Sequence, residues 1–196
     1  MIDEPILMDS ETTNIVAHWS KALKASDREA FKNIFNHFYA ILLAYASRIL
    51  ESRETAKDVV QEAFITLWNQ RSDVDPGKSL KAFLYRIVYT RCLNQIRDRR
   101  LVGLNEENFE NLTSMENFEP DIMNENTGIT EILEKIVSRL PERQREALLL
   151  SRQDGLTHDE IADIMECKPA TVNNHITGAL KNLRMYLKDM NIEGYQ

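Results

Sequence analysis

Cysteine and histidine are scarce in this sequence of 196 residues, and they form no ligand pattern. Cys92 and Cys167 lie too far apart to make a metal-ligand pair, and two thiols make no disulfide framework. We expect both cysteines to be small core residues. The four histidines include no pair at helical spacing, since His158 is followed by two acids but no second histidine stands four residues on. The sequence therefore predicts no metal site.

Glycine is also rare, with six residues that all stand singly. A loop that cradles the phosphates of a dinucleotide or a nucleoside triphosphate needs closely spaced glycines, and none can be written here. No set of nucleophile, base and orienting group can be assembled either. We therefore expect no cofactor and no enzymatic activity.

Long apolar segments are missing as well. The longest uninterrupted apolar run is the nine residues 38–46, whereas a membrane helix needs about 20. Residues 1–5 carry acids where a secretory signal would carry bases. These absences predict a cytoplasmic protein that does not insert into a membrane. With 43% hydrophobic residues and a net charge of −7, the chain is apolar enough to fold.

Apolar residues at helical spacing predict three helices in the first half of the chain. Ser26 and Glu29 form a predicted capping box at the start of the first helix. Ser52 is the expected N-cap of the second helix, and the third starts at Ser79. No segment alternates with a period of two for long enough to predict a strand. The predicted apolar faces are, in order, Phe31, Ile34, Phe35, Phe38, Leu42, Tyr45 and Ile49, then Val60, Phe64, Leu67 and Trp68, then Leu80, Phe83, Leu84, Ile87 and Val88.

The composition changes between residues 101 and 134, where nine acids occur and no lysine or arginine. Such a segment repels itself and extends, so we expect an acidic linker over residues 101–128. Helix resumes near Ile129. A further helix runs from Pro141, at its first turn, to about Gln153. The predicted fold is thus all-α, with two small helical domains joined by an acidic linker.

A helix-turn-helix pattern follows. Thr157 and Glu160 form a capping box, a short apolar helix comes next, and a tight turn leads into a longer helix opened by Pro169. Residues 167–188 contain four lysines or arginines and no acid, which favours a nucleic-acid footprint in a chain of net charge −7. The outward face of the longer helix carries side chains that suit base edges and phosphates in a major groove. They are Ala170, Thr171, Asn173, Asn174, Thr177 and Lys181.

Two further surfaces stand out in the first half of the chain. Residues 86–100 hold five arginines against one acid, which favours phosphate contacts over a merely solvated helix end. On the second helix, four residues at helical spacing form an exposed acidic stripe. If this stripe is functional, it should meet a basic protein partner. The stripe is Asp58, Gln61, Glu62 and Ile65.

Three motifs in one order give the chain a family resemblance. They are D-V-V-Q-E-A-F-I-T-L-W from residue 58, S-L-K-A-F-L-Y-R-I-V-Y-T-R-C-L-N-Q-I-R-D-R-R from residue 79, and L-P-E-R-Q-R-E-A-L-L-L followed by G-L-T-H-D-E-I-A-D-I-M-E-C-K-P-A-T-V-N-N-H-I from residues 140 and 155. Over residues 31–187 the chain resembles RNA polymerase sigma factors of the sigma-70 family, extracytoplasmic-function (ECF) subgroup. The resemblance implies an N-terminal segment (1–25), sigma region 2 (26–100), the acidic linker (101–128) and sigma region 4 (129–190).

The resemblance implies a transcription initiation factor that binds core RNA polymerase, directs it to specific promoters and helps DNA melting. The stripe Asp58, Gln61, Glu62 and Ile65 would dock on the polymerase β′ clamp helices. The turn at residues 72–78 and the third helix would bind the minus-ten element, through Lys78, Arg91, Asn94, Arg97, Arg99 and Arg100. Region 4 would touch the polymerase β flap and bind the minus-thirty-five element, through Lys168, Ala170, Thr171, Asn173, Asn174, Thr177 and Lys181. An anti-sigma factor, with or without a membrane anchor, is the third implied partner.

The helix-turn-helix departs from the family pattern at two positions. Glu166 stands where turns of the family often carry glycine, and a left-handed backbone there would cost about 1 kcal/mol or more. Lys168 replaces the usual serine or threonine cap.

Two other functions stay open on the residues alone. A stand-alone helix-turn-helix regulator would bind duplex operators without polymerase, and a palindromic site and a stable dimer are then expected. This function leaves the acidic stripe and the arginine-rich helix unexplained. A helical adaptor would imitate nucleic acid through its acidic linker, which leaves the basic helices unexplained.

Overall fold

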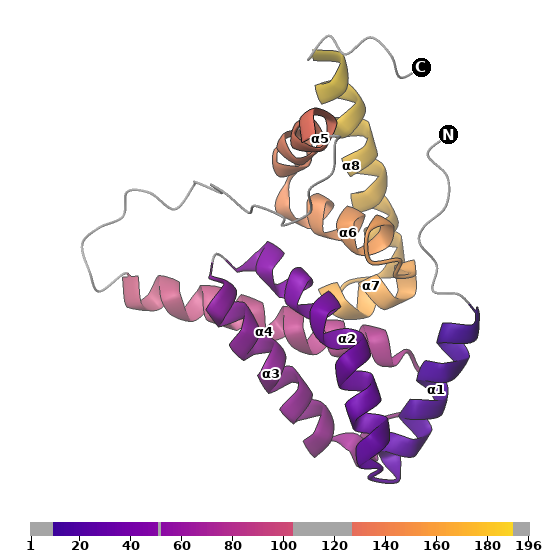
Figure 1. The fold of residues 1–196 in the computed structure, drawn as a ribbon. Helices are drawn as coiled ribbons and strands as arrows, with labels where there is room; N and C mark the ends of the chain where they lie inside the picture. Colours follow the sequence, from indigo (N-terminus) through magenta and orange to yellow (C-terminus); the bar gives the residue numbers. More distant parts are fainter. Residues whose placement is uncertain (1–9, 51, 104–126, 190–196) are drawn as a thin grey trace. The chain divides into compact units, whose positions relative to one another are not determined.

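The computed structural model describes residues 10–50, 52–103 and 127–189. Within these ranges it contains eight α-helices, one short 3-10 helix and no strand, which confirms the all-α prediction. The elements are α1 (Ser10–Lys24), α2 (Arg28–Ile49), α3 (Arg53–Asn69), η1 (Arg71–Asp73), α4 (Leu80–Gly103), α5 (Thr127–Ser138), α6 (Glu142–Arg152), α7 (His158–Met165) and α8 (Pro169–Asp189). They form two compact units, one of α1 to α4 and one of α5 to α8 (Figure 1). None of the described helices is long and apolar enough to cross a membrane.

The first unit packs α2, α3 and α4 against one another around large side chains. Phe38 of α2, Leu67 of α3 and Tyr85 of α4 are almost completely buried. The rings of Tyr45 and Tyr85 lie 4.7 Å apart between centroids and join α2 to α4. Burying a large apolar side chain contributes about 1.5–3 kcal/mol. This core fixes α3 and α4, the two helices that carry most of the predicted region 2 site residues.

Helix α1 was not predicted from the sequence, which suggested only an N-terminal segment there. Val16, Ser20 and Leu23 are buried and lie at helical spacing, so one face of α1 packs on the bundle. The helix contacts α2, α4 and η1. It therefore belongs to the core of the first unit.

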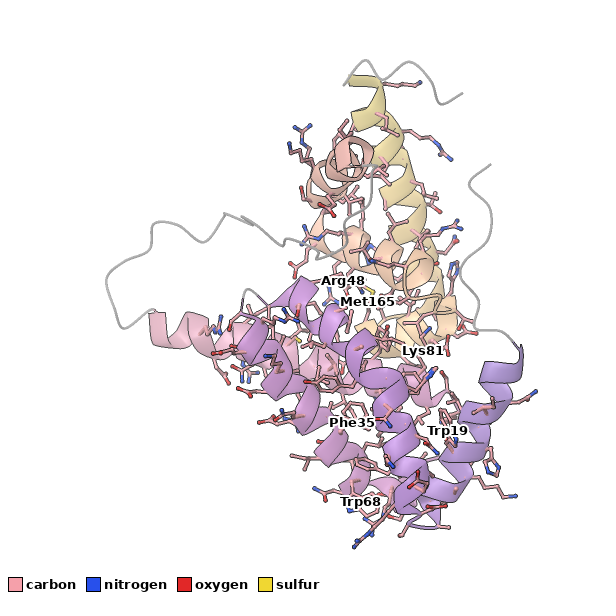
Figure 2. All side chains as sticks on the ribbon, viewed as in Figure 1. Trp19, Phe35, Arg48, Trp68, Lys81 and Met165 are labelled. Carbon is pink, nitrogen blue, oxygen red and sulfur yellow. The ribbon has the colours of Figure 1, made fainter. Side chains whose placement is uncertain are left out.

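His37 of α2 is half-buried beside α1. Its ring and the ring of Trp19 on α1 pack edge to face, with centroids 5.8 Å apart. His37 Nε2 is buried and has no hydrogen-bond partner among the described residues. Burial, and then the positive charge of Lys81 on α4, lower the pKa of His37 below its usual value of 6.5. Trp19 and Lys81 are labelled in Figure 2.

The predicted capping box of Ser26 and Glu29 is wrong. Asp27 is the N-cap of α2, which begins at Arg28. Asp27 Oδ1 accepts hydrogen bonds from the backbone N–H groups of Glu29 (2.8 Å) and Ala30 (3.3 Å). Ser26 instead has a left-handed backbone, with φ of 65°. A carboxylate is the better cap here, because it also offsets the partial positive charge of the helix N-terminus.

The second predicted cap is confirmed, whereas the buried face of α4 is rotated from the predicted one. Ser52 is the N-cap of α3. On α4, Phe83 and Ile87 are only half-buried, and Tyr85 and Tyr89 lie in the core instead. The tyrosines were left out of the predicted apolar face, although each can bury its ring while the hydroxyl keeps a polar partner.

The second unit packs α5, α6 and α7 against the long helix α8. Pro141 is the N-cap of α6, one position before the predicted first turn. Gly155 follows α6 with φ of 62°, a conformation that favours glycine.

Cys92 in the first unit is buried as predicted, but Cys167 is only half-buried. Cys167 departs from the prediction because it lies in the turn between α7 and α8 rather than on a packed helix face.

Helices cover both ends of the predicted acidic linker, since α4 runs to Gly103 and α5 begins at Thr127. Residues 104–126, with all the acids of the predicted linker 101–128, lie outside the described residues.

Candidate nucleic-acid and protein interfaces

The predicted stripe lies on the solvent side of α3. All four of its side chains are exposed, namely Asp58, Gln61, Glu62 and Ile65. Ile65 is 59% exposed, although isoleucine is usually among the most buried residues. The opposite face of α3 is buried in the core, so packing holds the stripe at the surface. A large apolar side chain among acids suits contact with a protein rather than with DNA.

An open aromatic groove runs between α2 and α3 beside this stripe. It is lined by Arg28, Phe31, Phe35, Gln61, Phe64, Ile65 and Trp68. The rings of Phe31 and Trp68 lie 5.1 Å apart between centroids, and those of Phe35 and Phe64 lie 4.8 Å apart. Phe35 and Trp68 are labelled in Figure 2. The groove was missed from the sequence, because the rings were assigned to buried faces although Phe31, Phe35 and Trp68 are only half-buried.

Arg91 of α4 reaches across to α3 and binds two side chains there. Its Nη1 forms an ion pair with the carboxylate of Glu62. Its Nη2 donates a hydrogen bond to Thr66 Oγ1 (2.8 Å). A residue of the predicted minus-ten set is thus joined directly to a residue of the predicted polymerase stripe. Thr66, which accepts from the same guanidinium, was not singled out from the sequence.

Arg99 makes a second bridge to α3, where its Nη2 donates to Thr55 Oγ1 (2.8 Å). Asn94 and Arg97 make no such bridge to α3 in the described residues, and their side chains are exposed, as that of Arg99 is. The structure therefore does not gather the predicted minus-ten residues on one face of α4, because two of the arginines point to α3. The side chain of Arg100 lies outside the described residues.

The turn that precedes α4 ends in the exposed side chain of Lys78. Arg71 holds the start of this turn, because its Nη1 donates to the carbonyl oxygen of Trp68 (2.7 Å). The guanidinium of Arg71 also lies 4.5 Å from the centroid of the Trp68 ring. Arg71 Nε donates to Ser26 Oγ (2.9 Å), in the loop between α1 and α2. Arg71, the residue just before the turn, thus ties it to α3 and to the loop between α1 and α2.

Helices α7 and α8 form the predicted helix-turn-helix, and the capping box of Thr157 and Glu160 is present. Glu166 in the turn has φ of 51°, so its backbone is left-handed. Ala162 of α7 is 3% exposed, so this small residue is buried in the packing of the second unit. On the outward face, Thr171 is half-buried, and the other predicted residues are exposed, namely Lys168, Ala170, Asn173, Asn174, Thr177 and Lys181.

Side-chain contacts hold α8 against α6. Asn182 Nδ2 donates to Gln144 Oε1 (2.8 Å). A β-carbon at Gly178 would lie 3.0 Å from Gln144 Nε2, so glycine allows the two helices to approach closely. Arg143 of α6 donates to the carbonyl oxygen of Met165, the last residue of α7 (3.4 Å). The exposed face of α8 therefore rests on a packed scaffold.

The two units match two parts of one family. The Sigma-70 region 2 model matches residues 34–102, and the Sigma-70, region 4 model matches residues 130–183. The ECF RNA polymerase sigma-E factor of Escherichia coli (strain K12) is 31% identical over 166 residues, which cover 79% of this chain and 84% of the relative. The chain belongs to the ECF group of the sigma-70 family. The RNA polymerase sigma-H factor of Pseudomonas aeruginosa is 26% identical to this sigma factor over 162 residues, with 79% and 84% of the two chains covered.

Two solved structures share the fold of this sigma factor. CnrH, in complex with the cytosolic domain of CnrY, has a TM-score of 0.63 and 20% identity, and the match covers 89% of this chain and 98% of that one. The sigma factor RpoE from Bartonella quintana, in complex with the anti-sigma factor NepR, has a TM-score of 0.63 and 22% identity, with coverage of 84% and 98%. As a member of its family, this protein is a transcription initiation factor that binds RNA polymerase.

Proposed function

We propose that α3 is the element of this sigma factor that docks on the β′ clamp helices of core RNA polymerase. The contacts come from Asp58, Gln61, Glu62 and Ile65. The observation that supports this most is the 59% exposure of Ile65 among acids, next to an open aromatic groove. The acids suit a basic partner surface, and the apolar side chains supply area that docking would bury.

Helix α4 and the turn before it contact the minus-ten element and stabilise its melted form. Extruding a base costs a few kcal/mol of stacking, which contacts to the phosphates and to the free base repay. No nucleotide hydrolysis enters this step, and the sigma factor itself catalyses no reaction. The proposed contacts are Lys78, Arg91, Asn94, Arg97, Arg99 and Arg100.

Helix α8 reads the minus-thirty-five element in the major groove, while region 4 also touches the polymerase β flap. The exposed side chains of α8 offer amide and hydroxyl groups for base edges, and lysines for phosphates. The proposed contacts are Lys168, Ala170, Thr171, Asn173, Asn174, Thr177 and Lys181.

An anti-sigma factor is the third proposed partner, in the cytoplasm where this protein works. RpoE is bound to its anti-sigma factor NepR, and CnrH is bound to the cytosolic domain of CnrY. The stripe and the groove of region 2, or the exposed face of region 4, are the surfaces that such a partner would cover. Covering the stripe would block polymerase docking.

Replacement of one exposed isoleucine tests the docking surface. Ile65→Ser should weaken binding to core polymerase about tenfold, since Ile65 is 59% exposed and burial of that part of its surface on docking contributes about 1–2 kcal/mol. Ile41→Ser is the matched control, because Ile41 is 41% exposed on α2 and does not line the groove. Titration of fluorescent sigma factor with core polymerase measures both. Equal core affinities for the two variants would contradict the assignment of the stripe.

A further inference from the structure

Thr66 of α3 links the two proposed surfaces of region 2. Its hydroxyl donates to the carbonyl oxygen of Glu62, one turn earlier (2.9 Å). Thr66 Oγ1 itself accepts a hydrogen bond from Arg91 Nη2 (2.8 Å). Because the hydroxyl hydrogen is engaged by the backbone, the lone pairs of Oγ1 are free to face α4. Thr66 is thus oriented as an acceptor for Arg91.

Glu62 holds the other terminal nitrogen of the same guanidinium. Two acceptors on separate nitrogens fix both the position and the plane of Arg91, which a single contact would not do. The side chain of Arg91 remains 34% exposed, and that of Glu62 remains 54% exposed. A guanidinium has five N–H donors, and these two contacts engage two of them. Further donors can therefore serve a phosphate from the solvent side.

We propose that Thr66 is a positioning residue that, together with Glu62, orients Arg91 toward the phosphates of the melted minus-ten strand. This inference rests on the proposed function, because it concerns how a promoter contact is presented. An unrestrained surface arginine loses rotamer freedom when it binds a ligand, whereas Arg91 has already lost much of it. Exposed ion pairs contribute little by themselves, so the effect should be severalfold rather than many decades.

A double-mutant cycle in the holoenzyme tests this role. Holoenzymes are assembled with the wild-type chain, Thr66→Val, Thr66→Ser, Arg91→Gln and the Thr66→Val/Arg91→Gln double variant. The probe is a fluorescent, pre-melted promoter fragment from a start site mapped with the wild-type holoenzyme. Its dissociation constant is measured over a range of salt concentrations, and binding to core polymerase is measured in parallel. This parallel titration separates docking from DNA contact.

We expect Thr66→Val to weaken DNA binding about three- to tenfold, as Arg91→Gln does. Both variants should also lower the salt slope, which is the steepness with which the logarithm of DNA affinity falls with the logarithm of salt concentration, by about one. Thr66→Ser keeps the hydroxyl, so its affinity for the promoter fragment and its salt slope should equal those of the wild-type chain. In the Arg91→Gln background, Thr66→Val should add no further loss. Core affinity should stay unchanged for Thr66→Val.

The outcomes separate this inference from the function on which it rests. The positioning role alone would be overturned if Thr66→Val bound DNA with wild-type affinity and salt slope. It would also be overturned if Thr66→Val reduced DNA affinity equally in the wild-type chain and in the Arg91→Gln variant. An Arg91→Gln variant with unaltered DNA binding would overturn it too, since Arg91 would then make no promoter contact. If the wild-type chain forms no promoter-binding holoenzyme, the proposed function itself fails.

Discussion

Glu166 occupies a turn position that favours glycine. Its backbone lies at φ 51° and ψ 50°, where a β-carbon costs about 1 kcal/mol or more. Met165 just before it and Val172 on α8 are buried, so packing of the two helices holds the turn in this conformation. The left-handed backbone on which the expected cost depends is therefore present at Glu166.

Glu166→Gly should raise the free energy of unfolding by about 0.5–1 kcal/mol, because relief of the strain exceeds the greater chain entropy of glycine. Urea unfolding followed by circular dichroism measures the change. Asp163→Gly is the control, since Asp163 is exposed in the interior of α7 and the same substitution there should lower the free energy of unfolding by about 0.3 kcal/mol. A comparable loss in both variants would mean that the turn is not strained.

His37 should make stability depend on pH. Its pKa is lowered in the folded protein, first by burial and then by Lys81, so the unfolded chain binds this proton more readily. Stability should therefore be fully present above about pH 6.5 and decline as the pH falls through the lowered pKa of His37. Urea unfolding at pH 7.5 and pH 5.5 measures the loss, and His37→Gln should make it smaller. An equal loss in the variant would assign the pH dependence to other groups.

At the scale of helices, local signals predicted most of the fold. The caps at Ser52 and Thr157 were predictable because a cap depends on residues within one turn. The cap of α2 was misplaced because Ser26 and Asp27 are adjacent candidates, and only the left-handed backbone of Ser26 decides between them. The sequence of α1 also has apolar residues at helical spacing, Val16 and Leu23 among them, but no helix was predicted from them. Elements were thus more predictable than the residues at which they begin.

The contacts between helices were not predictable from local pattern. Arg91 meets α3 because α4 is rotated so that Tyr85 and Tyr89 face the core. A rotation of this kind is set by how large rings fit against α2, as in the pair of Tyr45 and Tyr85. Composition indicated that the arginines of α4 belong to a DNA contact. It could not indicate that two of them would be held by acceptors on α3.

Helix α8 should separate base reading from phosphate binding. Asn174→Ala should reduce discrimination between the correct and an altered minus-thirty-five element by about 1–3 kcal/mol. Lys181→Gln should weaken binding to both sequences alike and lower the salt slope by about one. Competition between the two DNA sequences, measured with the holoenzyme at several salt concentrations, gives both quantities. Loss of discrimination in Lys181→Gln but not in Asn174→Ala would reverse the assignment of roles on α8.

For the whole molecule, the two compact units correspond to the two family regions, which match residues 34–102 and 130–183. Each unit presents a surface of its own, an arginine-bearing helix in the first and a helix-turn-helix in the second. Under the proposed function, a promoter is recognised when one DNA molecule offers both elements at once. Simultaneous binding by two tethered units multiplies their separate affinities through effective concentration. Promoter choice then belongs to the holoenzyme rather than to either unit.

Transcription of genomic DNA tests this account most directly. Core polymerase freed of other sigma factors is incubated with DNA of the source organism, with and without this protein, and the 5′ ends of the RNA are sequenced. We predict discrete start sites that depend on the protein, each preceded by the same two sequence elements, and their loss with Ile65→Ser. RNA ends that are identical with and without the protein, together with no binding to core polymerase, would contradict the assignment and favour a stand-alone regulator.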